Sequence, residues 1–146
     1  MKTLLLAEDN EDDVFFMERA IQQRKLGCSL RIARDGEEVI NYLNGEGAYA
    51  NREAFPLPTL ILLDIKMPRR NGHEVLEWIR EHETVATIPV IMLTSSNQDL
   101  DVNRAYRTGV NSYLIKPVKH QEFEETMQEL AHYWLKLNIS PALDGC

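Results

Sequence analysis

Short apolar segments alternate along the chain with longer stretches in which hydrophobic residues recur every three or four positions. The apolar segments carry almost no charge, which is typical of strands buried on both faces of a parallel sheet. The longer stretches have the periodicity of amphipathic helices. The pattern predicts strands over 3–7, 29–33, 59–63, 89–93 and 111–115, and helices over 11–25, 36–44, 73–82, 98–108 and 119–137.

Strands that alternate with helices form parallel βαβ units with right-handed crossovers. We therefore expect an α/β fold, a five-stranded parallel sheet flanked by five helices in a (βα)5 three-layer sandwich with flavodoxin-like strand order. Gly27 and Gly109 are expected to end the first and fourth helices, and Pro89 to open a strand. Residues 45–58 form the one long loop, whose two prolines keep its end extended.

The last predicted helix carries a long apolar stripe, which we interpret mainly as core packing. The members of the stripe are Phe123, Met127, Leu130, Trp134 and Leu137. Tyr133, Leu135 and Ile139 lie off it, and an additional apolar patch on a surface helix often marks an interface. We expect one domain over 1–137 and a tail, 138–146, that is too short for an effector domain.

Composition and charge exclude several classes of protein. The chain has 146 residues, 44% of them hydrophobic and 27% charged, which suits one domain with its own core. A net charge of −7 argues against nucleic acid as the main partner, and no apolar stretch could span a membrane. The chain turns acidic at Glu8, too early for a signal peptide. Cys28 and Cys146 are too few for a disulfide framework or a metal knuckle, so we expect a reducing, cytoplasmic location.

Four of the five predicted strands end at side chains with pronounced chemistry. Glu8 and Asp9 follow the first strand, Asp64 the third, and Lys116 the fifth, while Thr94 follows the fourth. The carboxyl ends of parallel strands meet at one edge of the sheet, where open α/β proteins bind their ligands. Three carboxylates at that edge repel one another unless a cation joins them.

These residue types suit phosphoryl transfer. Asp64 would be the nucleophile that forms an aspartyl phosphate, while Glu8 and Asp9 would help to hold Mg²⁺. Thr94 would donate a hydrogen bond to a phosphoryl oxygen, and Lys116 would bring an ammonium to the others. Each residue alone has a simpler explanation, such as a helix dipole partner, a turn residue or a solvated lysine. Those explanations are independent of one another, so it is improbable that all of them apply together. The combination of residues therefore favours a functional site.

Pro117 directly after Lys116 permits a cis peptide bond, which costs far less before proline than elsewhere. A cis turn would aim the ammonium of Lys116 inward over the acids. A trans bond in an ordinary strand-to-helix loop is the alternative, and the sequence leaves both open.

In this order the residues resemble the receiver domain of two-component response regulators, the CheY-like family. The matching motifs cover the chain from residue 3 to about 130. They are LAEDN at 6–10, LLDIKMP at 62–68 followed by Gly72, MLTS at 92–95, and YLIKP at 113–117. The long loop and the extended last helix further resemble the small single-domain regulators that serve bacterial and cyanobacterial phytochromes.

The resemblance implies that Asp64 accepts a phosphoryl group from a phosphohistidine on a sensor histidine kinase, with a phytochrome as the expected kind of partner. It also implies Mg²⁺ or Mn²⁺ held by Asp9, Asp64 and the backbone carbonyl of Lys66. Glu8 would contribute mainly through a coordinated water.

Thr94 and Tyr113 match the switch pair of the family. On phosphorylation the threonine hydroxyl moves to the phosphoryl oxygen and the aromatic ring turns inward. In physical terms, the new charge favours one of two pre-existing states of the fourth helix and its loops. Lys66 and Ser96 lie where the family tunes hydrolysis of the phosphate. As in many receivers, we expect a two-fold homodimer through the fourth helix, fifth strand and fifth helix.

A phosphohydrolase of the haloacid dehalogenase type is the main alternative, because it too forms an aspartyl phosphate at a strand end. Such enzymes place a second Asp two residues after the nucleophile, where this chain has Lys66. We therefore expect a signalling switch with self-catalysed phosphoryl transfer, and no enzyme. A flavodoxin-like cofactor binder would need a phosphate loop after the first strand, where this chain has acids. A receiver fold that only binds partners is disfavoured by the complete set of acids with Thr94 and Lys116.

Overall fold

Five parallel strands form one sheet in the order β2-β1-β3-β4-β5, in a computed structural model that describes residues 1–143. The strands are β1 (Lys2–Ala7), β2 (Cys28–Ala33), β3 (Leu60–Leu63), β4 (Val90–Thr94) and β5 (Ser112–Ile115). The helices are α1 (Glu11–Gln23), α2 (Gly36–Asn44), α3 (Gly72–Glu81), α4 (Asp99–Thr108) and α5 (His120–Ala131), with a 3-10 turn η1 (Gly47–Ala50) and a π-helical extension η2 (His132–Leu137). The predicted fold class and strand order are confirmed.

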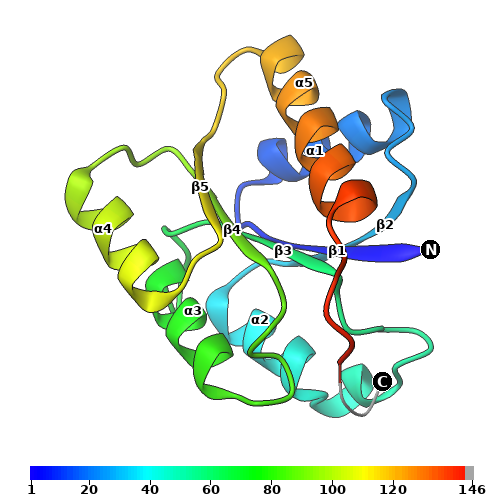
Figure 1. Cartoon of the computed structure of the whole chain (residues 1–146), viewed down its shortest axis with the longest axis vertical. Coiled ribbons are helices and arrows are strands. Elements are labelled where there is room, and N and C mark those ends of the chain that lie inside the picture. The colour runs from blue at the N-terminus through cyan, green and yellow to red at the C-terminus, as the bar shows by residue number, and fades with distance from the viewer. Residues whose placement is uncertain (144–146) are drawn as a thin grey trace.

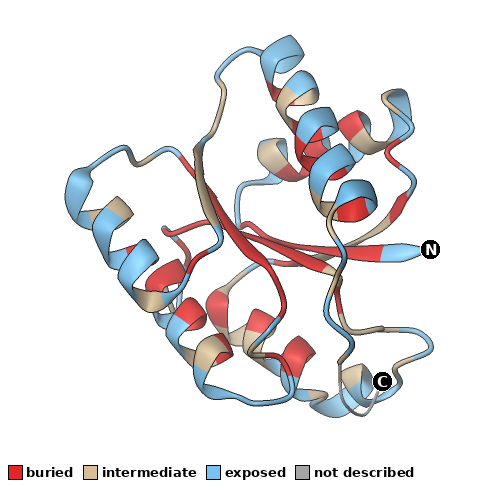
Figure 2. Ribbon diagram, viewed as in Figure 1, coloured by how far each residue is buried: buried red, intermediate tan, exposed pale blue. Residues whose placement is uncertain are grey.

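The sheet is the middle of three layers, with α1 and α5 on one face and α2, α3 and α4 on the other (Figure 1). Successive side chains of a strand point to opposite faces, so β3 contributes to both cores. Ile61 and Leu63 pack towards α2 and α3, whereas Leu60 and Leu62 pack towards α1 and α5. All four side chains are fully buried, and the central strands are accordingly red in Figure 2. Burial on both faces explains why these strands are uninterrupted apolar runs.

Polar side chains begin three of the helices. Asn10, Asp35 and Asn71 accept hydrogen bonds from the first-turn amides of α1, α2 and α3. Such caps satisfy amides that have no partner within the helix. The residues before α4 and α5, Gln98 and Lys119, make no such side-chain bond. α4 and α5 therefore begin without a side-chain cap from the residue before them.

The predicted ends of two helices have different outcomes. Gly109 has a left-handed backbone, with φ of 112°, and closes α4 as expected. Gly27 does not close α1, which already ends at Gln23. Lys25 and Gly27 both have positive φ, and the chain turns at these two residues before it enters β2.

Residues 45–58 are more ordered than the predicted loop. They contain η1, and the rings of Tyr49 and Phe55 pack against Tyr42 of α2. The guanidinium of Arg52 donates hydrogen bonds to the backbone carbonyls of Tyr42, Leu43 and Phe55. The helical periodicity that predicts longer elements cannot reveal a four-residue 3-10 turn.

The predicted apolar stripe of the last helix is wrong at Leu137, because residues 132–137 form the π-helix η2. The wider π turn places the next inward position five residues on, at Leu135, which is 6% exposed. Leu137 points outward and is 61% exposed, whereas Trp134 packs partly against the core. The regular helical period instead places Leu135 at the surface and Leu137 in the core.

Residues 138–143 pass the amino-terminal ends of β3 and β4. Pro141 and Leu143 line a small cleft with Pro58 and Pro89 from those ends. Residues 144–146, Cys146 included, lie outside the described part of the chain. Within the described part, no helix is long and apolar enough to cross a membrane.

Arg80 of α3 ties together three segments at the end of the sheet opposite to the predicted site. Its guanidinium donates hydrogen bonds to the carbonyls of Gly109, Ala86 and Ile88, each at 2.9 Å, and to the side-chain oxygen of Asn111 at 2.8 Å. These bonds fix the C-terminal end of α4 and the entry to β5.

We expect Arg80→Met to lower the free energy of unfolding by about 2–4 kcal/mol, because several acceptors lose a charged donor. Urea unfolding monitored by circular dichroism measures this change. Arg107→Met is the matched control, since Arg107 is exposed on α4, and it should stay within about 0.5 kcal/mol of the wild type. Equal effects of the two substitutions would contradict the structural role of Arg80.

Candidate functional site

Neighbouring strands bring the three predicted acids together. β1 pairs with β3, with Ala7 opposite Leu63, so the residues that follow them meet at the carboxyl edge of the sheet. One carboxylate oxygen each from Glu8, Asp9 and Asp64 lies within 4.8 Å of the other two. Glu8 and Asp64 are buried, whereas Asp9 is exposed. The expected convergence of these residues is thus present.

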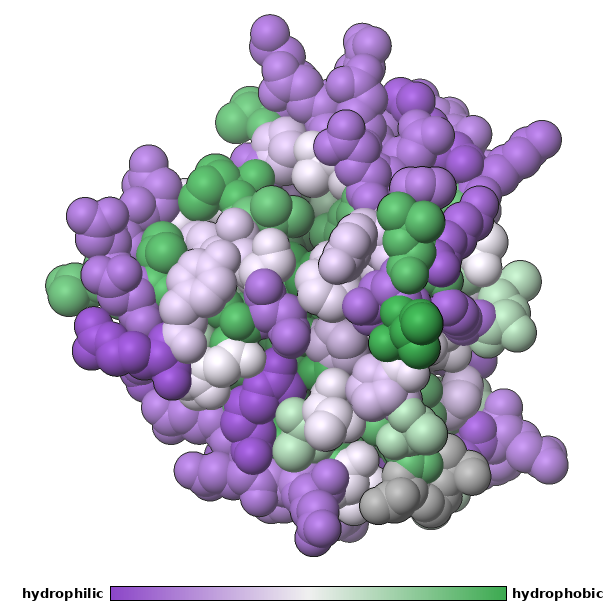
Figure 3. Space-filling model, viewed as in Figure 1, coloured by the Kyte–Doolittle hydropathy of each residue, from purple (hydrophilic) through white to green (hydrophobic). Residues whose placement is uncertain are grey.

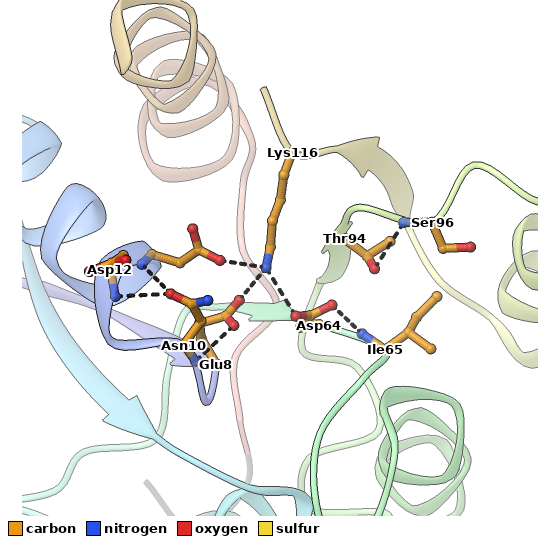
Figure 4. Close-up of polar contacts among 9 residues, drawn as sticks. Glu8, Asn10, Asp12, Asp64, Ile65, Thr94, Ser96 and Lys116 are labelled. Carbon is orange, nitrogen blue, oxygen red and sulfur yellow. Dashed lines mark hydrogen bonds and ion pairs between the residues drawn. The ribbon is translucent and has the colours of Figure 1, made fainter. Parts of the chain in front are cut away.

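Lys116 joins the acids from the end of β5. Its Nζ lies 2.6 Å from Oε2 of Glu8, 3.0 Å from Oδ2 of Asp64 and 2.9 Å from Oδ2 of Asp13 (Figure 4). The Lys116–Pro117 peptide bond is trans, so the cis alternative is not adopted. The ammonium reaches the acids without it.

Burial and crowding set the charges of this site. Burial raises the pKa of Glu8 to about 7, and the charge of Asp64 adds to the rise against the opposing effects of Lys116 and the Asn10 amide. Burial alone would lower the pKa of Lys116. Its hydrogen bonds to Glu8 and Asp13 and the charge of Asp64 outweigh burial and raise that pKa above its ordinary value. One ammonium therefore faces several carboxylates.

The donor set fits a hard divalent cation. Mg²⁺ and Mn²⁺ prefer carboxylate and carbonyl oxygens together with waters. Asp9, Asp64 and Lys66 line one open cavity of about 480 Å³, which leaves room for such a cation and for a phosphoryl group. A second positive charge beside Lys116 would reduce the repulsion among the carboxylates in this cavity.

The carboxylate of Asp64 is held in one orientation. Its Oδ1 accepts a hydrogen bond from the Ile65 amide at 2.7 Å, and its Oδ2 faces Lys116. The first residue of α3, Gly72, packs directly on the backbone of Asp64 and Ile65. A Cβ at Gly72 would lie 2.8 Å from the Cα of Ile65 and still closer to the Asp64 carbonyl oxygen, so only glycine fits.

We expect Gly72→Ala to destabilise the fold by about 2 kcal/mol and to slow any reaction at Asp64. Alanine would gain about 1 kcal/mol of helix propensity, but overpacking against rigid backbone costs more. Gly47→Ala is the control, because Gly47 has φ of 57° and a Cβ there would have no neighbour within 4 Å, so this variant meets backbone strain without a clash. Urea unfolding measures the free energy of unfolding of both variants. A smaller loss of that free energy in Gly72→Ala than in Gly47→Ala would contradict this packing argument.

The predicted switch residues meet at Ser96. Thr94 is fully buried at the end of β4, and Figure 4 shows it on the opposite side of Asp64 from Glu8. The Ser96 amide donates to Oγ1 of Thr94 at 3.4 Å, and the Tyr113 hydroxyl donates to the Ser96 carbonyl at 2.8 Å. Thr94 and Tyr113 thus share one partner.

Comparison with known proteins gives the family of the chain. The family of the response regulator receiver domain matches residues 4–128. The chain belongs to this family.

The chain is similar to regulatory proteins from other organisms. The probable methanogenesis regulatory protein FilR2 of Methanothrix harundinacea is 41% identical over 141 residues, covering 94% of this chain and 86% of that protein. Response regulator Rcp1 of Synechocystis is 33% identical over 141 residues, covering 97% and 94%, and its Mn(2+)-bound structure has a TM-score of 0.87. The phosphorylated cyanobacterial phytochrome response regulator RcpA has a TM-score of 0.90 at 32% identity, covering 97% of this chain and 99% of that one.

The receiver site contains one close contact that the sequence reasoning missed. Asp13 in the first turn of α1 accepts a hydrogen bond from Lys116. Three consecutive acids, Glu11, Asp12 and Asp13, open this helix and would all be read as partners of the helix dipole. Asp9 lies before the helix, which begins at Glu11, so helical spacing from the strand end does not single out Asp13.

Proposed function

We propose that this receiver accepts a phosphoryl group on Asp64 from a phosphohistidine of a sensor histidine kinase. A carboxylate oxygen of Asp64 would form the new bond to phosphorus while the phosphorus–nitrogen bond of the donor breaks, and the electron pair would leave with the imidazole. The observation that carries this proposal is the contact of Asp64 with Lys116 beside two further acids. Phosphoryl transfer requires mainly such positioning and charge neutralisation.

The surrounding side chains have separate tasks in this proposal. Asp9, Asp64 and the Lys66 carbonyl would hold Mg²⁺ or Mn²⁺, with Glu8 nearby, and the bound cation would offset the charge of the transferring group. The Mn(2+)-bound structure of Rcp1 supports a divalent cation. Lys116 would exchange its carboxylate partners for a phosphoryl oxygen.

The output of the receiver would be a change of shape. Thr94 would turn its hydroxyl to the phosphoryl group and Tyr113 would follow, so that α4 and its loops take up their second arrangement. We propose no turnover of a further substrate. We also propose a cytoplasmic location for this receiver and a phytochrome-type kinase as its partner. The likeness to RcpA, a phytochrome response regulator, supports the kind of partner.

Labelling with acetyl phosphate tests the proposal. The protein with Mg²⁺ should gain one phosphoryl group by intact mass, and hydroxylamine should remove it, as expected of an acyl phosphate. Chelation of the cation should prevent labelling. Steady hydrolysis of a generic phosphate ester such as p-nitrophenyl phosphate, without an isolable adduct, would favour the phosphohydrolase alternative instead.

An exposed apolar surface supports the proposed homodimer. Leu100 and Tyr106 of α4, Ile115 of β5 and Val118 after it are exposed. Figure 3, viewed from the side of β5, shows hydrophobic residues on this face between polar flanks. Such a patch on two neighbouring elements is suited to a two-fold interface, in which the same surface is used twice.

We expect Mg²⁺ and beryllofluoride, a phosphoryl mimic, to increase the dimer fraction in sedimentation velocity. Tyr106→Asp should weaken the dimer about tenfold or more, because a charge would enter the apolar interface. Phe15→Asp is the control, since Phe15 is an exposed apolar residue of α1, and it should leave the dimer unchanged. A monomer both with and without the mimic would remove this part of the proposal.

A further inference from the structure

Ser96 is the common neighbour of the two proposed switch residues. Its backbone amide contacts Thr94 and its backbone carbonyl accepts from Tyr113. Any displacement of Ser96 therefore changes the hydrogen bonds of both. What holds Ser96 in place decides how readily the switch moves.

The side chain of Ser96 is bound to α4 and, through it, to α3. Its Oγ donates to Oδ2 of Asp101 at 2.6 Å, while Oδ1 of Asp101 lies 3.0 Å from Nε2 of His73. A carboxylate only accepts hydrogen bonds, so Nε2 of His73 carries a proton. His73 is 2% exposed, and its Nδ1 has no hydrogen-bond partner among residues 1–143, so Asp101 is its side-chain partner there. We call these three residues the α4 latch.

The latch starts beside the proposed phosphoacceptor. His73 follows Gly72, whose backbone rests on the Asp64 carbonyl. Asp101 lies in the first turn of α4. The latch thus forms a continuous path from the Asp64 loop, across the start of α3, to α4 and the 95–98 segment.

Few other contacts within the described chain hold the start of α4. Ala105 is the buried residue of this helix, and Gln98 provides no side-chain cap. An acid at the third position often bonds the amide before its helix, but here Asp101 is committed to Ser96 and His73. The ion pair between Arg104 and Glu77 of α3 is half exposed and contributes little. A helix with so little buried surface opens at low cost, so the latch is a substantial part of its anchorage.

We propose that Asp101 is a positioning residue that, with His73 and Ser96, holds α4 and residues 95–98 in the resting arrangement. Movement of Thr94 towards a phosphoryl group on Asp64 would pull on Ser96 and must loosen the latch. The strength of the latch would therefore set the balance between the resting and switched states. This inference rests on the proposed function for its consequence, but the latch itself can be tested without phosphorylation.

Hydrogen exchange of the unphosphorylated protein in a chelator tests the latch. Asp101→Ala and Ser96→Ala should accelerate exchange of the α4 amides about tenfold, because the helix start opens more often. Asp99→Ala also removes a first-turn acid from α4 but touches no latch residue, so it should exchange like the wild type. Ser96→Thr retains the hydroxyl and should restore protection. Wild-type exchange in both latch variants, or equal acceleration in Asp99→Ala, would overturn the inference.

The rate of labelling by acetyl phosphate distinguishes a positioning role from a purely structural one. A residue that only stabilised α4 would not slow labelling in the wild type. If the latch opposes the switched state, Asp101→Ala should be labelled about threefold faster than the wild type, despite its weaker α4. A slower or unchanged rate would overturn the proposed positioning role. If the wild type takes up no phosphoryl group at all, the proposed function fails, and the exchange experiment still decides whether the latch exists.

Discussion

Asp64→Asn is expected to abolish phosphoryl labelling by acetyl phosphate. The amide of asparagine has almost the shape of the carboxylate and can still accept a hydrogen bond from the Ile65 amide. It carries no negative charge, however, so it is a poor nucleophile and a weak ligand for Mg²⁺. Intact mass after incubation with Mg²⁺ and acetyl phosphate measures the loss.

Asp99→Asn is the matched control for this substitution, because Asp99 is an exposed acid at the start of α4. It should be labelled at the wild-type rate. Labelling of Asp64→Asn to the same extent as the wild type would place the phosphoryl group on another residue. A circular dichroism spectrum of Asp64→Asn is needed to show that the variant is folded.

Lys116→Met should slow labelling of Asp64 by about a hundredfold, because a preorganised charge near the transferring group is lost. The same substitution should strengthen Mg²⁺ binding. The ammonium now contacts Glu8, Asp13 and Asp64, so its removal frees carboxylate oxygens and leaves the site one unit more negative. Calorimetric titration should show stronger Mg²⁺ binding by Lys116→Met, whereas the labelling assay should show a slower rate.

Lys119→Met controls for the loss of a lysine near the site, because Lys119 is exposed in the same loop. It should change neither quantity appreciably. A general structural defect of Lys116→Met would weaken Mg²⁺ binding and slow labelling in parallel. That parallel loss would contradict the assigned role of Lys116.

Much of the fold could be predicted because burial on both faces leaves an obvious pattern. The predicted strand 59–63 corresponds to β3, Leu60–Leu63, and its successor Asp64 lies where the pattern places it. The extended last helix shows the limit of this approach. A π turn changes the spacing of inward positions, so the regular helical period wrongly exposes Leu135 and buries Leu137.

The acids of the site were predictable because strand order brings the ends of β1 and β3 together. The contact with Asp13 depends on the exit angle of α1 and on which of three successive acids turns inward, which is set by packing. The latch was equally hidden. His73 and Asp101 are 28 residues apart, and each has an ordinary interpretation as a helix residue.

The central claim is that Asp64, its neighbouring acids and Lys116 form one cation-dependent phosphoacceptor site. Peptide mapping by mass spectrometry after acetyl phosphate labelling and borohydride reduction, which marks an acyl phosphate, tests it most directly. We expect the mark on Asp64 alone, and only when Mg²⁺ or Mn²⁺ is present. A mark on a different residue, or an equal yield in the presence of a chelator, would contradict the account.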